Sequence, residues 1–189
     1  MAAVRYRRPR HSRPREPELT ATVAGAREGS EEDFRTLYRG LHPALLGYLT
    51  ARLGSGAEAA EAASAMWRDI AHGMLSFHGD GTDFRIWAAS LARRHLAQRP
   101  QPDRAGARSS SSIPDDVWRP LAALPTGLAD ALLLRGVVGL DDPAVAQVLG
   151  TTVESVRTAA EHAQWLVADC LASRPAPDEP GAEWSCTWC

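Results

Sequence analysis

One stretch of the sequence sets the strongest limit on the fold: 141-DDPAVAQVLGTTVESVRTAAEHAQ-164. Asp142 followed by Pro143 is typical of a helix start, because aspartate caps free amides and proline lacks the amide hydrogen that the first turn leaves unpaired. Gly150 suits the left-handed residue after a helix end, and one of the two threonines behind it can cap a second helix. The pattern predicts a helix-turn-helix, with an ordinary helical hairpin as the alternative.

The second helix of this pair carries little positive charge for an element that reads DNA. Only Arg157, and His162 when it is protonated, can attract a polyanion there. The wider segment 115–172 holds three Arg against six Asp and two Glu, a net charge of −5. Residues 1–18 hold six Arg against two Glu, a net charge of +4. Because neutralised phosphates supply most non-specific affinity for DNA, segment 115–172 should bind DNA weakly by itself.

The rest of the chain predicts an all-α protein of two small helical domains. Residues 31–99 show apolar side chains at three- and four-residue steps, which predicts three helices, with a kink or break at Pro43. Residues 100–114, PQPDRAGARSSSSIP, have the composition of a flexible linker, so the two domains need not pack on each other. Residues 115–172 then form the second domain, which contains the helix-turn-helix.

The two ends of the chain predict disorder. Residues 1–30 form an Arg- and Pro-rich arm, which is either solvated or in contact with nucleic acid. Residues 173–189 form a tail that ends in Cys186-Thr187-Trp188-Cys189, half of a zinc or redox site or simply two free thiols. No apolar run approaches the ~20 residues that cross a bilayer, and no secretion signal is present, so we expect a cytoplasmic location without membrane insertion.

Two parts of the chain carry a resemblance to a known family. LAALPTGLADALLLRGVVGLDDPAVAQVLGTTVESVRTAAEHA resembles the promoter-reading C-terminal domain of extracytoplasmic-function (group IV) sigma factors. FRTLYRGLHPALLGYLTARLG and FHGDGTDFRIWAASLARRHLA look like the N-terminal domain of the same family, in the same order. The resemblance implies a divergent member, with a sigma region 2-like three-helix domain followed by a sigma region 4-like helix-turn-helix domain.

The implied function is that of an alternative sigma factor rather than an enzyme. Such a protein binds core RNA polymerase, places its first domain at the −10 element and its last at −35, and is commonly held by an anti-sigma factor. No cofactor is expected, because the sequence has no phosphate-binding loop and no cluster at metal-ligand spacing. One alternative is a sigma-like interaction protein that binds polymerase or an anti-sigma regulator without reading promoter DNA. Another is a free-standing helix-turn-helix repressor, which leaves the first domain unexplained.

The helical pattern places six candidate DNA contacts on the solvent face of the recognition helix. They are Glu154, Ser155, Arg157, Thr158, Glu161 and His162. Arg157 suits a guanine or a phosphate, since its planar fork matches both. Glu154 or Glu161 can accept from a cytosine amino group, or can serve only to keep the helix soluble. Where the family carries basic residues, this helix has Ala159, Glu161 and Gln164, so tethering to polymerase has to compensate for weak binding.

The resemblance places further candidates in the first domain. Those for the −10 strand are His78, Arg85, Arg93, Arg94 and Arg99. The loop around 78–83 could hold an extruded base, and Trp87 either stacks on a base or packs in the core. Candidates for binding core polymerase are Glu61, Ser64 and Trp67. In the run 61-EAASA-65 alanines replace the bulkier family residues, which predicts a weaker contact.

Overall fold

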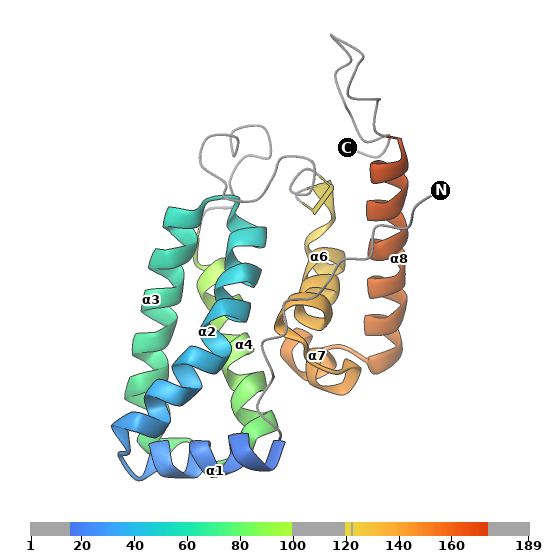
Figure 1. The fold of residues 1–189 in the computed structure, drawn as a ribbon. Helices are drawn as coiled ribbons and strands as arrows, with labels where there is room; N and C mark the ends of the chain where they lie inside the picture. The colour runs from blue at the N-terminus through green and yellow to red at the C-terminus, as the bar shows by residue number, and fades with distance from the viewer. Residues whose placement is uncertain (1–15, 100–119, 122, 174–189) are drawn as a thin grey trace.

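The computed structural model describes residues 16–99, 120–121 and 123–173, and we call 16–99 the first unit and 120–173 the second (Figure 1). The regular elements in these ranges are all helices, with no strand, which confirms the all-α prediction. The predicted linker 100–114, the Arg-rich residues 1–15 and the terminal Cys pair lie outside the described residues.

The first unit contains four α-helices and one short 3-10 helix. They are α1 (Glu16–Arg27), α2 (Glu31–Leu53), α3 (Gly56–Gly73), η1 (Met74–Ser76) and α4 (Gly81–Ala97). In Figure 1, α1 lies across the lower ends of the helices that follow it. The side chain of Ser30 caps α2, that of Ser55 caps α3, and Gly54 ends α2 in the left-handed conformation.

Helix α1 corrects the prediction that residues 1–30 form a disordered arm. Leu19, Val23 and Ala26 occupy one face of α1 and are 2%, 1% and 5% exposed, in contact with the core of the first unit. The Arg- and Pro-rich composition ends at residue 15, and an apolar stripe at helical spacing begins behind it. The first unit therefore has one more α-helix than the three helices that the sequence pattern predicted.

Helix α2 continues through Pro43 without a break. Proline removes one backbone hydrogen bond from a helix interior, a loss that tertiary packing can offset. Leu41 and Leu45, on either side of Pro43, are 6% and 1% exposed, so this part of α2 is held by buried side chains. Of the kink or break predicted at Pro43, the break is therefore wrong, since α2 is one helix from Glu31 to Leu53.

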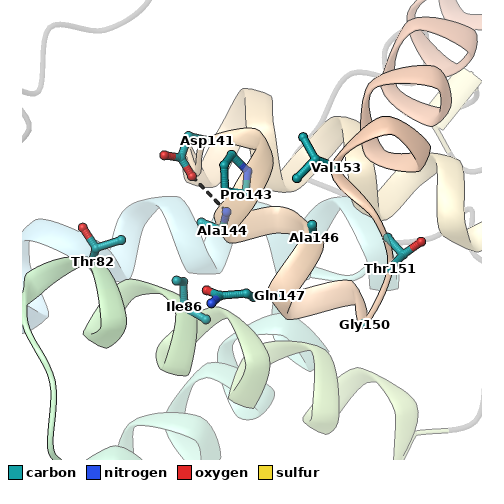
Figure 2. Close-up of a pocket in the computed structure, with 10 residues that line it drawn as sticks. All are labelled: Thr82, Ile86, Asp141, Pro143, Ala144, Ala146, Gln147, Gly150, Thr151 and Val153. Carbon is teal, nitrogen blue, oxygen red and sulfur yellow. Dashed lines mark hydrogen bonds between the residues drawn. The ribbon is translucent and has the colours of Figure 1, made fainter.

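The second unit contains α6 (Thr126–Leu133), the π-helical turn η2 (Leu134–Val138), α7 (Asp142–Leu149) and α8 (Val153–Ala172). Gly150 is left-handed (φ 67°) and the Thr152 side chain accepts from the amide of Ser155, as the helix-turn-helix prediction required. The cap of α7 is Asp141 rather than Asp142: its carboxylate accepts from the amide of Ala144 at 2.9 Å (Figure 2).

The two units pack directly on each other. A single buried apolar cluster continues from the first unit into η2 and α7, where it includes Val138, Val145 and Val148 at 5%, 0% and 6% exposure. Helix α7 contacts α4, and η2 contacts α2. In Figure 1, α6 and α7 accordingly lie between the first unit and α8. The sequence pattern allowed two independent domains, whereas in this structure the larger of two buried apolar clusters spans both units, and a smaller one lies within the second unit.

Candidate nucleic-acid and polymerase interfaces

Helix α8 presents the predicted recognition face to solvent. All six candidates, Glu154, Ser155, Arg157, Thr158, Glu161 and His162, are exposed. The opposite side of α8 holds Val156, Ala160 and Ala163, which are 1%, 0% and 0% exposed. The apolar stripe therefore fixes the rotation of α8, and a shallow hollow of about 420 Å³ lies along its first two turns.

Arg157 is held by an ion pair at the start of α7. Its Nε lies 3.0 Å from Asp142 Oδ2, and Arg135 Nε lies 2.7 Å from the other oxygen of the same carboxylate. The Arg157 side chain is 63% exposed, and ion pairs of such exposure contribute about 1 kcal/mol or less. Arg157 can therefore leave the Asp142 carboxylate and bind a DNA phosphate at little cost in free energy. The carboxylate nevertheless lowers the positive potential of this face.

Three of the four candidate arginines of the first unit are engaged in ion pairs. Arg94 lies 3.0 Å from Asp69, and Arg99 lies 3.2 Å from Glu61. The Asp69 carboxylate accepts hydrogen bonds from both His95 and Arg94. These bonds lower the pKa of Asp69, and the bond from His95 has the larger effect. The contacts of Asp69 with His95 and Arg94 therefore stabilise the fold at any pH above the ordinary Asp pKa. This stabilisation is lost as the pH falls through the lowered pKa of Asp69 in the folded protein.

Arg93 points toward the second unit rather than away from the molecule. Its Nε lies 3.6 Å from Asp130 of α6, and its Nη1 donates to the carbonyl of Val148 of α7 at 3.4 Å. Of the remaining candidates, His78 is exposed in the loop, and Arg85 is half-buried with an Nε that lacks a hydrogen-bond partner among the described residues. The structure therefore does not gather the five candidates into one free basic surface.

The loop before α4 is held by α1. The amide of Gly81 donates to Thr20 Oγ1 at 3.1 Å, and Thr82 Oγ1 donates to Glu16 at 2.8 Å. This support from α1 was missed at the sequence level, because residues 16–27 were assigned to the arm. Polar groups of α1 thus contact the candidate loop 78–83 at Gly81 and Thr82, where α4 begins.

Trp87 packs in the core of the first unit. Its ring stacks on Phe77 at 5.0 Å between centroids and meets Phe84 edge-on at 5.9 Å. A side chain at Gly73 would collide with it, since an added Cβ lies 2.8 Å from the Trp87 ring. Core packing, one of the two roles considered for Trp87, is therefore its role in this structure.

The candidates for polymerase binding on α3 differ in accessibility. Glu61 and Ser64 are exposed, and the Ser64 hydroxyl donates to the carbonyl of Ala60. Trp67 is only 6% exposed and packs against Phe34 and Tyr38, with centroid distances of 6.0 and 4.9 Å. Trp67 thus offers almost no surface to a partner.

Tyr38 is the exposed member of the same aromatic cluster, and the sequence-based set of candidates missed it. It is 38% exposed and stacks on His42 at 4.5 Å. Burial lowers the pKa of His42, so the ring is neutral near pH 7. The four-residue spacing of Phe34, Tyr38 and His42 along α2 was the signal that could have identified this cluster.

Among the described residues, no group of three His, Cys, Asp or Glu side chains could hold a metal ion. The candidate pair Cys186 and Cys189 lies outside these residues, and Cys170 of α8 is buried and disulfide-bonded. None of the described helices is long and apolar enough to cross a membrane.

The architecture, a helical unit followed by a helix-turn-helix unit, is shared with a protein of known structure. A solved structure, that of CnrH in complex with the cytosolic domain of CnrY, is similar to this chain with a TM-score of 0.66. The likeness covers 82% of this chain and 98% of that one, at 21% sequence identity. CnrH is an extracytoplasmic-function sigma factor, so the resemblance noted in the sequence is confirmed at the level of the fold. No family model and no curated protein matches the chain.

Proposed function

We propose that this protein is an alternative sigma factor, which binds core RNA polymerase and directs promoter-specific initiation of transcription. The observation that carries the proposal is the order of the two helical units, which the chain shares with a sigma factor over nearly the whole length of that protein. The exposed recognition face of α8 supplies the surface for the −35 element. The protein acts in the cytoplasm as an initiation factor, without catalytic chemistry or a cofactor of its own.

The first unit is the proposed partner of core polymerase and of the −10 element. Glu61 and Ser64 of α3 and the exposed edge of Tyr38 lie on neighbouring helices, α3 and α2, which pack on each other. Polymerase would contact this surface, while Trp67 supports it from below. Arg85 and Arg94 of α4 and the loop 78–83 would face the −10 strand.

Weak electrostatic affinity for DNA is part of this proposal. The recognition face carries Arg157 as its one arginine, and Arg157 shares Asp142 with Arg135. Each phosphate contact contributes roughly 0.9 to the salt slope of binding, so the slope of the isolated chain should be shallow. Attachment to polymerase supplies an effective concentration on the order of millimolar, which compensates for a weak contact.

The direct test is binding to purified core polymerase, followed by transcription from a library of randomised promoters. A sigma factor retains core at sub-micromolar concentration, and the transcribed templates share two motifs at the spacing of −35 and −10. Absence of core binding at that concentration contradicts the proposal. The full-length chain with Glu61→Gln is a matched variant, because it changes one exposed charge on the polymerase-facing helix.

A second candidate function is a sigma-like interaction protein that binds polymerase or an anti-sigma regulator without reading promoter DNA. The net charge of −5 over residues 115–172 favours it. CnrH was solved with the cytosolic domain of CnrY, and a partner of comparable kind is proposed for this chain under either function. Footprinting of the polymerase complex separates the two, since only a sigma factor protects the −35 element.

A further inference from the structure

The positive charge of the chain is concentrated in one short segment. Residues 1–15 hold six of the 21 basic residues, all of them arginine, and no acidic residue, which gives a net charge of +6. Residues 16–189 hold the other 15 arginines against all 23 acidic residues, a net charge of −8. We call residues 1–15 the basic arm. A protein that binds a polyanion through a body of net charge −8 needs a separate source of positive charge.

The arginines of the described helices supply little of this charge, because carboxylates hold most of them. Among the described residues, the arginines without an ion pair are Arg27, Arg68 and Arg85, of which Arg68 is exposed. The other described arginines, each paired with at least one carboxylate, are Arg35, Arg39, Arg52, Arg93, Arg94, Arg99, Arg135 and Arg157. The paired carboxylates offset most of the charge of these arginines, so the helices present little positive potential to DNA phosphates.

The structure fixes the point at which the basic arm joins the first unit. The arm is attached to Glu16 of α1, whose carboxylate accepts a 2.8 Å hydrogen bond from the hydroxyl of Thr82. One turn later, Thr20 Oγ1 accepts from the amide of Gly81 at 3.1 Å. A Cβ added to Gly81 would lie 2.8 Å from both Glu16 Oε1 and Leu19 Cγ, so glycine permits this close approach. The first turn of α1 is therefore held against the start of α4 (Figure 1).

This attachment point lies beside the loop 78–83, which is proposed to face the −10 strand. Asp80 and Asp83 of the loop are exposed and form a capping box, in which each carboxylate accepts from the backbone amide of the other residue. Together with Glu16 and Glu18 in the first turn of α1, they make this region acidic. An approaching phosphate backbone is repelled by such a region, and a basic segment attached at the same place can offset the repulsion.

We propose that the basic arm binds promoter DNA next to the −10 element and supplies most of the electrostatic attraction between this protein and the promoter. This inference rests on the proposed function. Fifteen residues span at most ~50 Å, and the ten steps from Arg5 to Arg15 span at most ~35 Å, a length over which duplex DNA presents roughly 20 phosphates. The planar fork of arginine suits a phosphate. The −35 element is about 25 base pairs from the −10 element, or ~85 Å of duplex, and therefore lies beyond the arm.

The basic arm acts where polymerase already holds the −10 strand against the first unit. Its short attachment to α1 then gives an effective concentration on the order of millimolar at the neighbouring phosphates. In the isolated chain, the acidic residues 16–189 repel DNA and retain cations near it, which offsets the arm and keeps the salt slope shallow. The weakly charged recognition helix then has only to select the −35 sequence, while the basic arm provides attraction that carries no sequence information.

The first experiment measures the salt dependence of promoter binding by the full chain in complex with core polymerase. One variant removes the positive charge of the basic arm through Arg5→Gln, Arg7→Gln, Arg8→Gln, Arg10→Gln, Arg13→Gln and Arg15→Gln. If half of these arginines contact phosphates, the salt slope should fall in magnitude by about 2 to 2.7, which reduces the gain in affinity between 200 and 50 mM salt by ~20- to 40-fold. Lysine at the same six positions should preserve most of the slope, because it keeps the charge. A glutamine variant with the wild-type slope overturns the inference.

Two matched double variants separate a contact of the basic arm from an effect of net charge. Arg13→Gln with Arg15→Gln removes two charges from the arm. Arg35→Gln with Arg39→Gln removes two charges from the exposed surface of α2, where both arginines pair with Glu32. Only the arm variant should lower the salt slope, by about 1.4 to 1.8. Equal changes in the two variants would make net charge responsible and would refute a contact of the arm.

The third experiment locates the basic arm in the polymerase complex. A photo-reactive phenylalanine analogue replaces Tyr6 of the arm in one variant and Thr158 of the recognition helix in the other. The analogue at position 6 should crosslink to DNA within about 10 base pairs of the −10 element, because ten residues reach at most ~35 Å. The analogue at position 158 should crosslink to the −35 element. Crosslinks from position 6 only to polymerase or to the −35 element contradict the proposed location.

These outcomes separate the inference from the proposed function. If wild type binds polymerase and protects the promoter while the arm variants behave as wild type, the inference fails and the proposed function stands. If wild type does not bind polymerase, the proposed function fails, and the inference fails with it because no −10 strand is held at α4. If the salt slope depends on the arm and position 6 crosslinks beside the −10 element, the inference stands.

Discussion

Neutralising Asp142 should strengthen the contact of Arg157 with DNA. The Asp142 carboxylate is 18% exposed and holds Arg157 at 3.0 Å and Arg135 at 2.7 Å, so it competes with a phosphate for both guanidinium groups. With Asp142→Asn, one additional phosphate contact steepens the salt slope by about 0.9, and between 200 and 50 mM salt this amounts to roughly a 3.5-fold further gain in affinity. Loss of the charge also weakens the first turn of α7 by about 0.3–1 kcal/mol, which leaves the fold intact.

The assay is fluorescence anisotropy of a labelled promoter duplex with the polymerase-bound protein, titrated at several salt concentrations. Asp141→Asn is the matched control: it removes the same charge one residue away, and asparagine can still cap α7. Only Asp142→Asn should steepen the slope. If both variants steepen it equally, net charge rather than the Arg157 pair is responsible. If neither does, Arg157 does not contact a phosphate.

Three further predictions concern the first unit. Leu49→Ala removes a 0% exposed side chain from α2 and should lower the free energy of unfolding by about 2–5 kcal/mol in urea titrations, whereas a similar change at the exposed Leu75 should cost little. Burial lowers the pKa of His42, so the protein should lose stability as the pH falls below the ordinary histidine value of 6.5; His42→Gln should reduce this loss, as urea midpoints at pH 5 and 8 will show. Tyr38→Ala should weaken binding to core polymerase with little change in melting temperature. Trp67→Ala should instead lower the melting temperature by several degrees. If both variants weaken core binding equally while stability stays unchanged, the assignment of Trp67 as a buried support is wrong.

Local signals were sufficient to predict much of the second unit. Gly150 and Thr152 mark the turn between α7 and α8 because each meets a backbone requirement that few other residues satisfy. The apolar spacing of α8 was also sufficient to predict its exposed face, because the apolar stripe of the helix is buried and the polar stripe faces solvent. The predicted cap of α7, Asp142, lies one residue after the observed cap, Asp141. The two aspartates are chemically equivalent candidates, and the local sequence does not select between them.

Contacts between distant parts of the chain were not predictable in this way. Tyr48 and Asp130 are 82 positions apart, and nothing local to either residue identifies the other as its partner. Helix α1 was missed for a different reason: the strongly basic residues 1–15 dominated the composition, and the Leu19–Val23 spacing behind them was read as part of the arm. Both misses concern surfaces that one element buries against another.

The ion pair between Arg99 and Glu61 connects the two functions proposed for the first unit, binding to core polymerase and binding to the −10 strand. Glu61 belongs to the surface proposed for polymerase, and Arg99 to the set proposed for DNA, yet their side chains lie 3.2 Å apart. If polymerase binds the Glu61 carboxylate, Arg99 loses its ion-pair partner. The affinity of Arg99 for a nucleic-acid strand should then increase. Thermodynamic reciprocity requires that DNA capture of Arg99 favours polymerase by the same factor, about fivefold or less for a pair this exposed. Assembly on the enzyme and affinity for the promoter would then reinforce each other through one shared charge.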